Sequence, residues 1–126
     1  MAVLQKLFMS VMVLLCMYFV VVDGAIATAT YYNPPYTHKK SGVMIAAASK
    51  ELWNNRAVCG KRYRVKCLGA TNRRAPYPCK PKNEIEITIV DLCPGCKGLS
   101  IDLSREAFGV IAALSAGRID IQLLPL

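Results

Sequence analysis

The sequence has few of the side chains that carry metal or acid–base chemistry. Its 126 residues include one histidine, His38, and eight acidic residues, and no Asp or Glu occurs between Asp23 and Glu51. A structural zinc site takes about four ligands at paired short spacings. The chain offers one such pair, Cys93 and Cys96, so the sequence predicts neither a metal site nor a cofactor.

An apolar segment near the N-terminus indicates the compartment. Lys6 is the only charge in the first ten residues, and Val11 to Val22 is almost wholly apolar. This run is short for a membrane span, and Ala25-Ile26-Ala27 has the small-residue pattern of a cleavage site. We therefore expect a signal peptide over residues 1–27, cut at about 24–27, and a single secreted domain over residues 28–126. An uncleaved membrane anchor is the alternative.

An odd number of cysteines remains once the apolar segment, which contains Cys16, is removed. The five that remain are Cys59, Cys67, Cys79, Cys93 and Cys96. In a small secreted domain an odd count means a free thiol or a missing partner. A thioredoxin-type Cys-x-x-Cys pair would begin a helix, whereas Lys97-Gly98-Leu99-Ser100 follows here. Cys93 and Cys96 are therefore interpreted as a local disulfide.

Positive charge is concentrated in the middle of the chain, whose net charge is +8. A basic face of this kind favours anionic partners such as pectic polysaccharide, lipid headgroups or nucleic acid. A solvated face that keeps the protein soluble is the alternative. The residues concerned are Lys61, Arg62, Arg64, Lys66, Arg73, Arg74, Lys80 and Lys82.

Alternation of apolar and polar residues predicts mainly strands. Arg62 to Cys67 alternates strictly, with its basic residues on one face. Ile85 to Asp91 alternates as well, with its isoleucines facing inward and Asp91 continuing that inward set at the strand end. Further strands are expected over residues 28–32, 43–48 and 118–124, and a loop over residues 69–81.

One helix is expected late in the chain. Ser104 is a suitable N-cap, and Glu106 lies in the first turn, where a negative charge is favourable. Apolar residues then recur at helical spacing from Ala107 to Ala112. Five or more strands with a single late helix predict a small β-barrel.

Several motifs in a fixed order give the sequence a family resemblance. They are Ala29-Thr30-Tyr31-Tyr32 and the stretches 43–49, 52–55, 59–67, 69–72, 90–93 and 101–108. Together they resemble the plant natriuretic peptide-like proteins, also described as endoglucanase-45-like domain or blight-associated proteins, which are related to expansins. The resemblance runs from about Thr28 to the C-terminus. One departure is Arg56, where relatives often have glycine.

This resemblance implies a fold and a role. The fold is a mainly β, six-stranded double-psi β-barrel, similar to the first domain of expansins, with one short helix. The role is that of a secreted apoplastic protein in water and ion homeostasis and stress response, acting by binding a membrane receptor or an anionic cell-wall polysaccharide. An expansin-like or defence-related protein that binds wall glycan directly, without hydrolysis, is the alternative. We expect a monomer that does not bind nucleic acid.

Asp102 matches the aspartate that acts as general acid in the related endoglucanases. Glycosidases commonly need two carboxylates across the scissile bond, but where those enzymes carry the base this chain has Tyr31, Tyr32 and Asn33. Asp91 is the other carboxylate expected nearby. We therefore expect ligand or glycan contact through Tyr31, Tyr32, Asp91 and Asp102, and no catalytic residue. Weak lytic activity through Asp102, or a purely capping role for it, are the alternatives.

The resemblance also implies a disulfide pattern. Relatives carry a cysteine in the loop that here runs from Tyr36 to Gly42, and this chain has none there. The implied pairs are Cys67 with Cys79 and Cys93 with Cys96, which leaves Cys59, the partner of the missing cysteine, as the free thiol. Without that tether, the segment from Tyr36 to Gly42 is expected to be the most mobile part of the fold.

Overall fold

The computed structural model describes residues 2–19, 24–37 and 39–126, without the side chains of residues 11–19 and 39. Residues 20–23 of the expected signal peptide and His38 of the expected mobile loop lie outside the described residues. The first element is helix α1 (Ala2–Phe19). In the part of the chain that the structure describes, no helix combines the length and the apolar character needed to cross a membrane.

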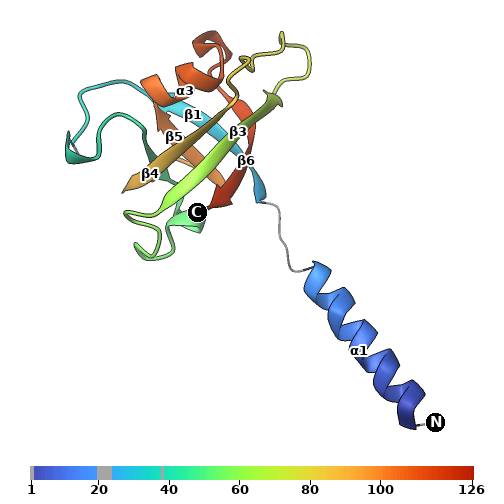
Figure 1. Ribbon diagram of the computed structural model, residues 1–126. Helices are drawn as coiled ribbons and strands as arrows, with labels where there is room; N and C mark the ends of the chain where they lie inside the picture. Colours follow the sequence, from blue (N-terminus) through green and yellow to red (C-terminus); the bar gives the residue numbers. More distant parts are fainter. Residues whose placement is uncertain (1, 20–23, 38) are drawn as a thin grey trace.

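Six strands close into a barrel (Figure 1). The order around the barrel is β1-β5-β2-β4-β3-β6. β1 runs parallel to β5 and β2 runs parallel to β4, and the other neighbouring pairs are antiparallel. The expected six-stranded barrel is therefore confirmed. The strands are β1 (Ala25–Tyr32), β2 (Ile45–Ala48), β3 (Arg62–Ala70), β4 (Glu84–Leu92), β5 (Ser100–Ser104) and β6 (Ile119–Pro125).

Alternating residues of the strands fill the barrel interior. On β3, Val65 and Cys67 are buried, whereas Arg62 and Lys66 are exposed. The isoleucines of β4 are buried in the same alternating way. Burial of apolar surface contributes about 25 cal/mol for each Å² removed from water, so this alternation sets which face of each strand turns inward. The sequence-based prediction for β3 and for most of β4 is confirmed.

Two elements escaped the sequence-based prediction. β5 alternates polar and apolar residues over only five positions and was not recognised as a strand; in the fold both of its serines are buried along with Ile101 and Leu103. Helix α2 (Lys50–Trp53) is a single turn of four residues, too short to show helical periodicity. β2 begins at Ile45 rather than at residue 43, and all four of its residues are buried.

Asp91 is exposed, and its predicted inward orientation is wrong. The pairing of β2 with β4 shifts register at this point: Ala46 is opposite Ile89, but Ala47 is opposite Asp91. The shift leaves Val90 without a partner on β2. A bulge of this kind bends the strand and redirects the side chains that follow, so the alternation from Ile85 to Ile89 does not extend to Asp91.

Helix α3 (Arg105–Ile111) begins at the predicted N-cap and lies across one end of the barrel (Figure 1). The Ser104 hydroxyl accepts a hydrogen bond from the Ala107 N–H at 3.1 Å and donates one to the Val43 carbonyl oxygen. Removal of a serine N-cap typically costs about 1 kcal/mol. The helix buries Ala107, Phe108 and Ile111 against the barrel, so the capping bond also anchors part of the core.

Three consecutive residues after α2 have left-handed backbone conformations. The φ angles are 46° at Asn54, 52° at Asn55 and 70° at Arg56. Asparagine tolerates this region, but an arginine there costs on the order of 1 kcal/mol because its Cβ crowds the following carbonyl group. A glycine at position 56 would have no such cost.

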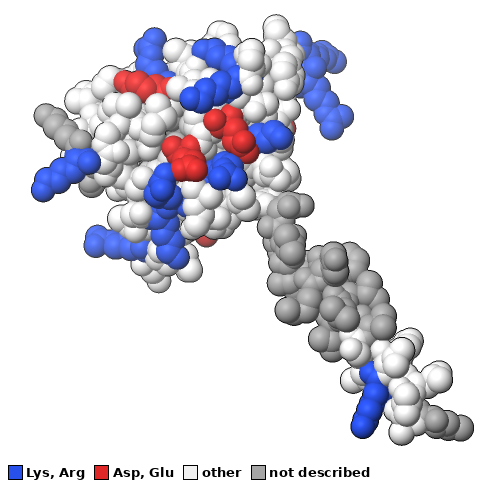
Figure 2. All heavy atoms as spheres, in the orientation of Figure 1, with Lys and Arg blue, Asp and Glu red and all other residues white. Residues whose placement is uncertain are grey.

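The basic face of the barrel is interrupted by acidic residues. Arg62 and Arg64 of β3 both contact Glu86 of β4, Arg64 at 3.6 Å. Lys66 lies opposite Glu84 in the β3–β4 ladder. Figure 2 shows acidic side chains among the basic ones on this side of the molecule. Exposed pairs of this kind contribute at most about 1 kcal/mol each, but they neutralise much of the predicted basic strand.

Two disulfides reinforce the barrel. Cys67 is joined to Cys79, with a Cα–Cα distance of 5.7 Å, and Cys93 is joined to Cys96, at 5.3 Å. Among the described residues Cys59 is the free cysteine, and it is exposed. A cross-link that closes a loop the size of the one between Cys67 and Cys79 stabilises by about 3 kcal/mol in the chain-entropy model.

Thiol labelling of the denatured, unreduced protein tests this arrangement. We expect one label per mature chain, mapped to Cys59, and none in Cys59→Ser. Replacing both Cys67 and Cys79 by alanine should lower the free energy of unfolding by about 3 kcal/mol. Cys59→Ser is the matched control and should change it little, because Cys59 is exposed. A label at Cys67 or Cys93 in the unreduced protein would overturn the pairing.

Candidate functional site

A cleft of about 450 Å³ lies beside the β1–β5 pair. Its walls come from segments distant in the sequence: two strands, the turn closed by the Cys93–Cys96 disulfide, and the chain entering β6. The polar side chains among its lining residues are Thr28, Thr30, Lys97, Ser100, Asp102 and Arg118.

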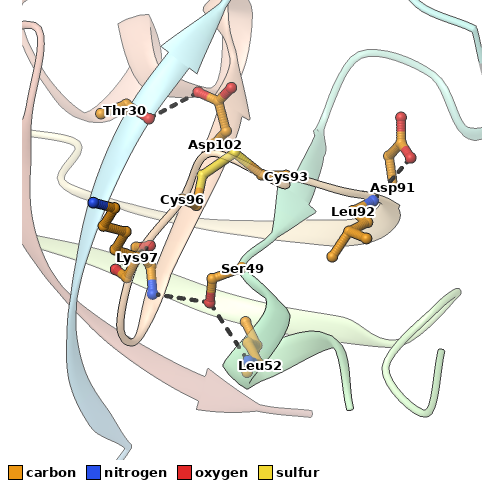
Figure 3. Close-up of a disulfide and its surroundings, with 10 residues drawn as sticks. Thr30, Ser49, Leu52, Asp91, Leu92, Cys93, Cys96, Lys97 and Asp102 are labelled. Atoms are coloured by element: carbon orange, nitrogen blue, oxygen red, sulfur yellow. Dashed lines mark hydrogen bonds between the residues drawn. A yellow bond between two sulfur atoms is a disulfide. The ribbon is translucent and has the colours of Figure 1, made fainter. Parts of the chain in front are cut away.

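A hydrogen bond between Thr30 and Asp102 lies at the centre of this site. The two residues are partners in the parallel β1–β5 ladder, and the Thr30 hydroxyl donates to the Asp102 carboxylate at 2.9 Å. Figure 3 shows the two side chains pointing toward each other, with the disulfide beside them. Alternation along β1 turns Ala27 and Ala29 into the core, so Thr28 and Thr30 are left on the cleft side.

Burial changes the acidity of Asp102. Desolvation raises the pKa of this carboxyl above its ordinary value, and the hydrogen bond from Thr30 partly opposes that rise. A carboxyl with a raised pKa holds its proton more readily than a free aspartate. Asp102 can therefore accept a hydrogen bond from a ligand hydroxyl group when ionised and donate one when protonated.

Tyr32 lies two residues after Thr30 on β1, surrounded by carboxylates. Burial, followed by the charges of Asp102, Tyr36, Asp91 and Glu106, raises the pKa of Tyr32 to about 12. Its phenol therefore remains neutral at physiological pH and keeps its hydrogen-bond donor. The Tyr36 ring packs edge-on against Tyr32, with 5.2 Å between the ring centroids.

Hydrogen bonds join the segment that follows β1 to the start of α3. The Tyr36 hydroxyl donates to the Glu106 carboxylate and accepts from the Arg105 N–H at 3.2 Å. The Arg105 guanidinium donates to the Asn33 side-chain oxygen at 3.4 Å. Tyr36 is therefore held in place, and the expected mobility of the residues that follow it stays a prediction.

Of the four predicted contact residues, Tyr31 is separated from the others. Tyr31 turns toward the core and packs on Phe108, with 4.9 Å between the ring centroids. Asp91 is exposed, and its carboxylate accepts a hydrogen bond from the Leu92 N–H at 2.8 Å. Figure 3 shows Asp91 apart from the Thr30–Asp102 pair. Asp102 is the predicted residue that lines the cleft, and Tyr32 lies close enough to Asp102 and Asp91 for their charges to raise its pKa.

Several residues of the cleft were not predicted from the sequence. Thr28 and Thr30 alternate with buried alanines, and that pattern could have identified them. Lys97 and Arg118 have no comparable signal, because a turn and a strand entrance bring them to the cleft. Neither forms an ion pair with a described residue. The described part of the chain contains no cluster of three His, Cys, Asp or Glu residues able to hold a metal ion.

Comparison with protein families and curated relatives gives consistent matches. The family model described as lytic transglycolase matches residues 45–123. An EG45-like domain containing protein of Citrus jambhiri is 54% identical over 102 residues, which covers 75% of this chain and 76% of that protein. The EG45-like domain containing protein 2 of Arabidopsis thaliana is 35% identical over 112 residues and covers 84% of each chain.

Solved structures share the barrel at low sequence identity. The apo expansin of Clavibacter michiganensis superposes with a TM-score of 0.63 at 23% identity. The match covers 80% of this chain and 49% of the expansin. A mutant of the same expansin, solved in complex with cellohexaose, has a TM-score of 0.59. At this identity the likeness establishes the fold alone.

The environment of Tyr32 can be tested by its pH dependence. The phenol holds its proton more tightly in the folded chain, where its pKa is about 12, than in the unfolded chain, where the ordinary value is about 10. Stability therefore falls as the pH rises through this window, because the unfolded chain binds fewer protons. Between pH 10 and 12, the free energy of unfolding should fall by about 1 kcal/mol less in Tyr32→Phe than in the wild type. This figure allows for the partial exposure of Tyr32.

Urea unfolding followed by circular dichroism at each pH measures this difference. Tyr77→Phe, which removes an exposed tyrosine, is the control and should follow the wild type. The same pH dependence in Tyr32→Phe and in the wild type would contradict the assignment.

Proposed function

The chain belongs to the EG45-like domain family, and on that premise we propose that it is a secreted cell-wall protein that binds polysaccharide without hydrolysing it. The observation that carries the proposal is the cleft around the hydrogen-bonded Thr30–Asp102 pair. The cellohexaose complex of the expansin with the same fold gives further support.

The groups in the cleft suit a carbohydrate. Thr28, Thr30 and Asp102 offer hydroxyl and carboxyl groups that can exchange hydrogen bonds with sugar hydroxyl groups. Lys97 and Arg118 add two positive charges, which favour a polysaccharide that carries carboxylates. Tyr32 contributes a neutral phenol near Asp102.

The arrangement of carboxylates favours binding over hydrolysis. Glycosidases place two carboxyl groups across the bond that they break. Among the described residues that line the cleft, Asp102 is the carboxylate. Glu106 accepts the Tyr36 hydrogen bond, and exposed Asp91 accepts one from its own neighbour. These contacts support a role for Asp102 in ligand contact rather than in acid–base catalysis with a partner.

The resemblance to natriuretic peptide-like proteins supports a finer proposal about biological role. In this proposal the protein acts in water and ion homeostasis and in stress responses in the plant apoplast. The same cleft would serve that role by contacting either a membrane receptor or the wall polysaccharide itself. Retention on purified wall polysaccharide favours the wall as the direct partner, and lack of retention favours the receptor.

Retention on cellulose and pectin tests the proposed binding. We expect Asp102→Ala and Tyr32→Ala each to weaken retention by roughly tenfold, the effect of losing one good hydrogen bond to a ligand. Retention on pectin should fall with added salt, because mobile ions screen the cations of the cleft. Arg73→Gln, which removes a charge from an exposed loop, is the control.

Two results would count against this proposal. Equal retention of Asp102→Ala and of the wild type would remove the cleft as the binding site. Release of reducing sugar by the wild type that disappears in Asp102→Asn would make the protein a hydrolase.

We also propose that the N-terminal segment is a signal peptide removed no later than after Gly24. Ala25, Ile26 and Ala27 pair with β6, and Ala27 is buried. A Cβ at position 24 would lie 2.3 Å from the Leu123 carbonyl oxygen, so glycine is the residue that fits at the entry to the strand. Cleavage after Ala27 would remove three residues that belong to the barrel.

Intact mass and N-terminal sequencing of the secreted protein check the cleavage site. We expect the mature chain to begin at Ala25 or earlier. A shortened version that begins at Thr28 should lose roughly 1 kcal/mol of unfolding free energy for each ladder hydrogen bond removed. A secreted chain that begins at Thr28 with undiminished stability would contradict this proposal.

A further inference from the structure

A second cleft, also of about 450 Å³, is lined by Trp53 at the end of α2. Its other lining residues are Lys50, Asn55, Arg56 and Leu92. Trp53 packs partly against the core and remains partly accessible. The pocket therefore presents an aromatic surface bordered by two cations and an amide.

Both cations are available to a ligand. Lys50 and Arg56 are exposed, and neither forms an ion pair or a side-chain hydrogen bond with another described residue. This differs from β3, where Arg62 and Arg64 share Glu86. Glu51 and Asp91 are the sequence neighbours of two lining residues, but neither lines the pocket. No carboxylate on the described lining therefore competes with an anionic ligand.

The backbone of the pocket is held in a strained conformation. Asn55 and Arg56 both lie in the left-handed region, with φ angles of 52° and 70°. Glycine would relieve the strain at position 56, yet the residue present is a long cation that borders the pocket. Strain of this kind is found preferentially where a side chain has a binding task.

We propose that the Trp53 pocket is a second carbohydrate site, separate from the Asp102 cleft, and that it binds a carboxylated sugar unit of an acidic polysaccharide. The apolar face of the sugar ring lies against the indole. The ring carboxylate takes charge-assisted hydrogen bonds from the Arg56 guanidinium and the Lys50 ammonium group. Asn55 provides an amide for a ring hydroxyl group.

The Trp53 pocket and the Asp102 cleft are neighbours along the chain. Leu92 lines the Trp53 pocket, and the next residue, Cys93, lines the Asp102 cleft. Figure 3 shows the chain passing from Leu92 to Cys93 and the disulfide. The second site does not depend on occupation of the first.

Tryptophan fluorescence reports directly on the pocket, because Trp53 is the only tryptophan in the sequence. The probes are an oligogalacturonide and, as the uncharged comparison, a cello-oligosaccharide of the same length. We expect a saturable change in emission with the oligogalacturonide that weakens with added salt. The uncharged oligomer should give a much weaker response.

Substitutions at the two cations separate binding from folding. Lys50→Gln and Arg56→Gln should each weaken the oligogalacturonide response by roughly tenfold. Arg73→Gln removes the same charge from a loop outside the pocket and should change the affinity little. Arg56→Gly should bind as weakly as Arg56→Gln while unfolding at a higher urea concentration than the wild type, because the left-handed strain is relieved.

Several outcomes would overturn the proposal. These are an unchanged emission, an equal response to the uncharged oligomer, or an equal loss of affinity in Arg73→Gln and Arg56→Gln. Loss of the response in Asp102→Asn, with the response retained in Arg56→Gln, would assign the ligand to the other cleft. Retention on cellulose through Asp102 is a separate measurement, so either site can fail while the other stands.

Discussion

β1 holds the barrel and the proposed binding cleft together. Its two edges pair with different partners: parallel with β5 on one side and antiparallel with β6 on the other. The first pairing places Thr30 beside Asp102 and Tyr32 opposite Ser104, the residue that caps α3. The second closes the barrel, which leaves no exposed sheet edge. One strand therefore both completes the core and assembles the cleft.

Buried serines connect this pairing to the short helices. Ser104 caps α3 and is bound to the Val43 carbonyl group, while Ser49 caps α2 and also accepts from the Ser100 N–H at 3.4 Å. Both serines are fully buried with hydrogen-bond partners. Because a buried polar group without partners is costly, these bonds fix where the strands end and the helices begin. α2, which Ser49 caps, carries Lys50 and Trp53 of the second proposed site.

Much of the fold was predictable from the sequence because strands with one buried face alternate. β3 and the first part of β4 follow this rule, and the α3 cap was recognisable from Ser104. β5 follows the same alternation, but over only five residues, and it was overlooked; α2 gives no periodic signal because it is a single turn. The predicted orientation of Asp91 was wrong because a register shift depends on how two strands pair, and the sequence of one strand does not show it.

The class of fold, the family, the α3 cap and the set of cysteines could all be inferred from the sequence, because each depends on local spacing or on short motifs. Tertiary structure alone decided which polar residues meet. Lys97 and Arg118 join Thr30 at one cleft, whereas the Trp53 pocket is formed mainly by residues 50–56, to which the fold adds Leu92. The physical reason is that barrel closure brings together residues far apart in the chain, and their neighbours in space depend on strand order and register.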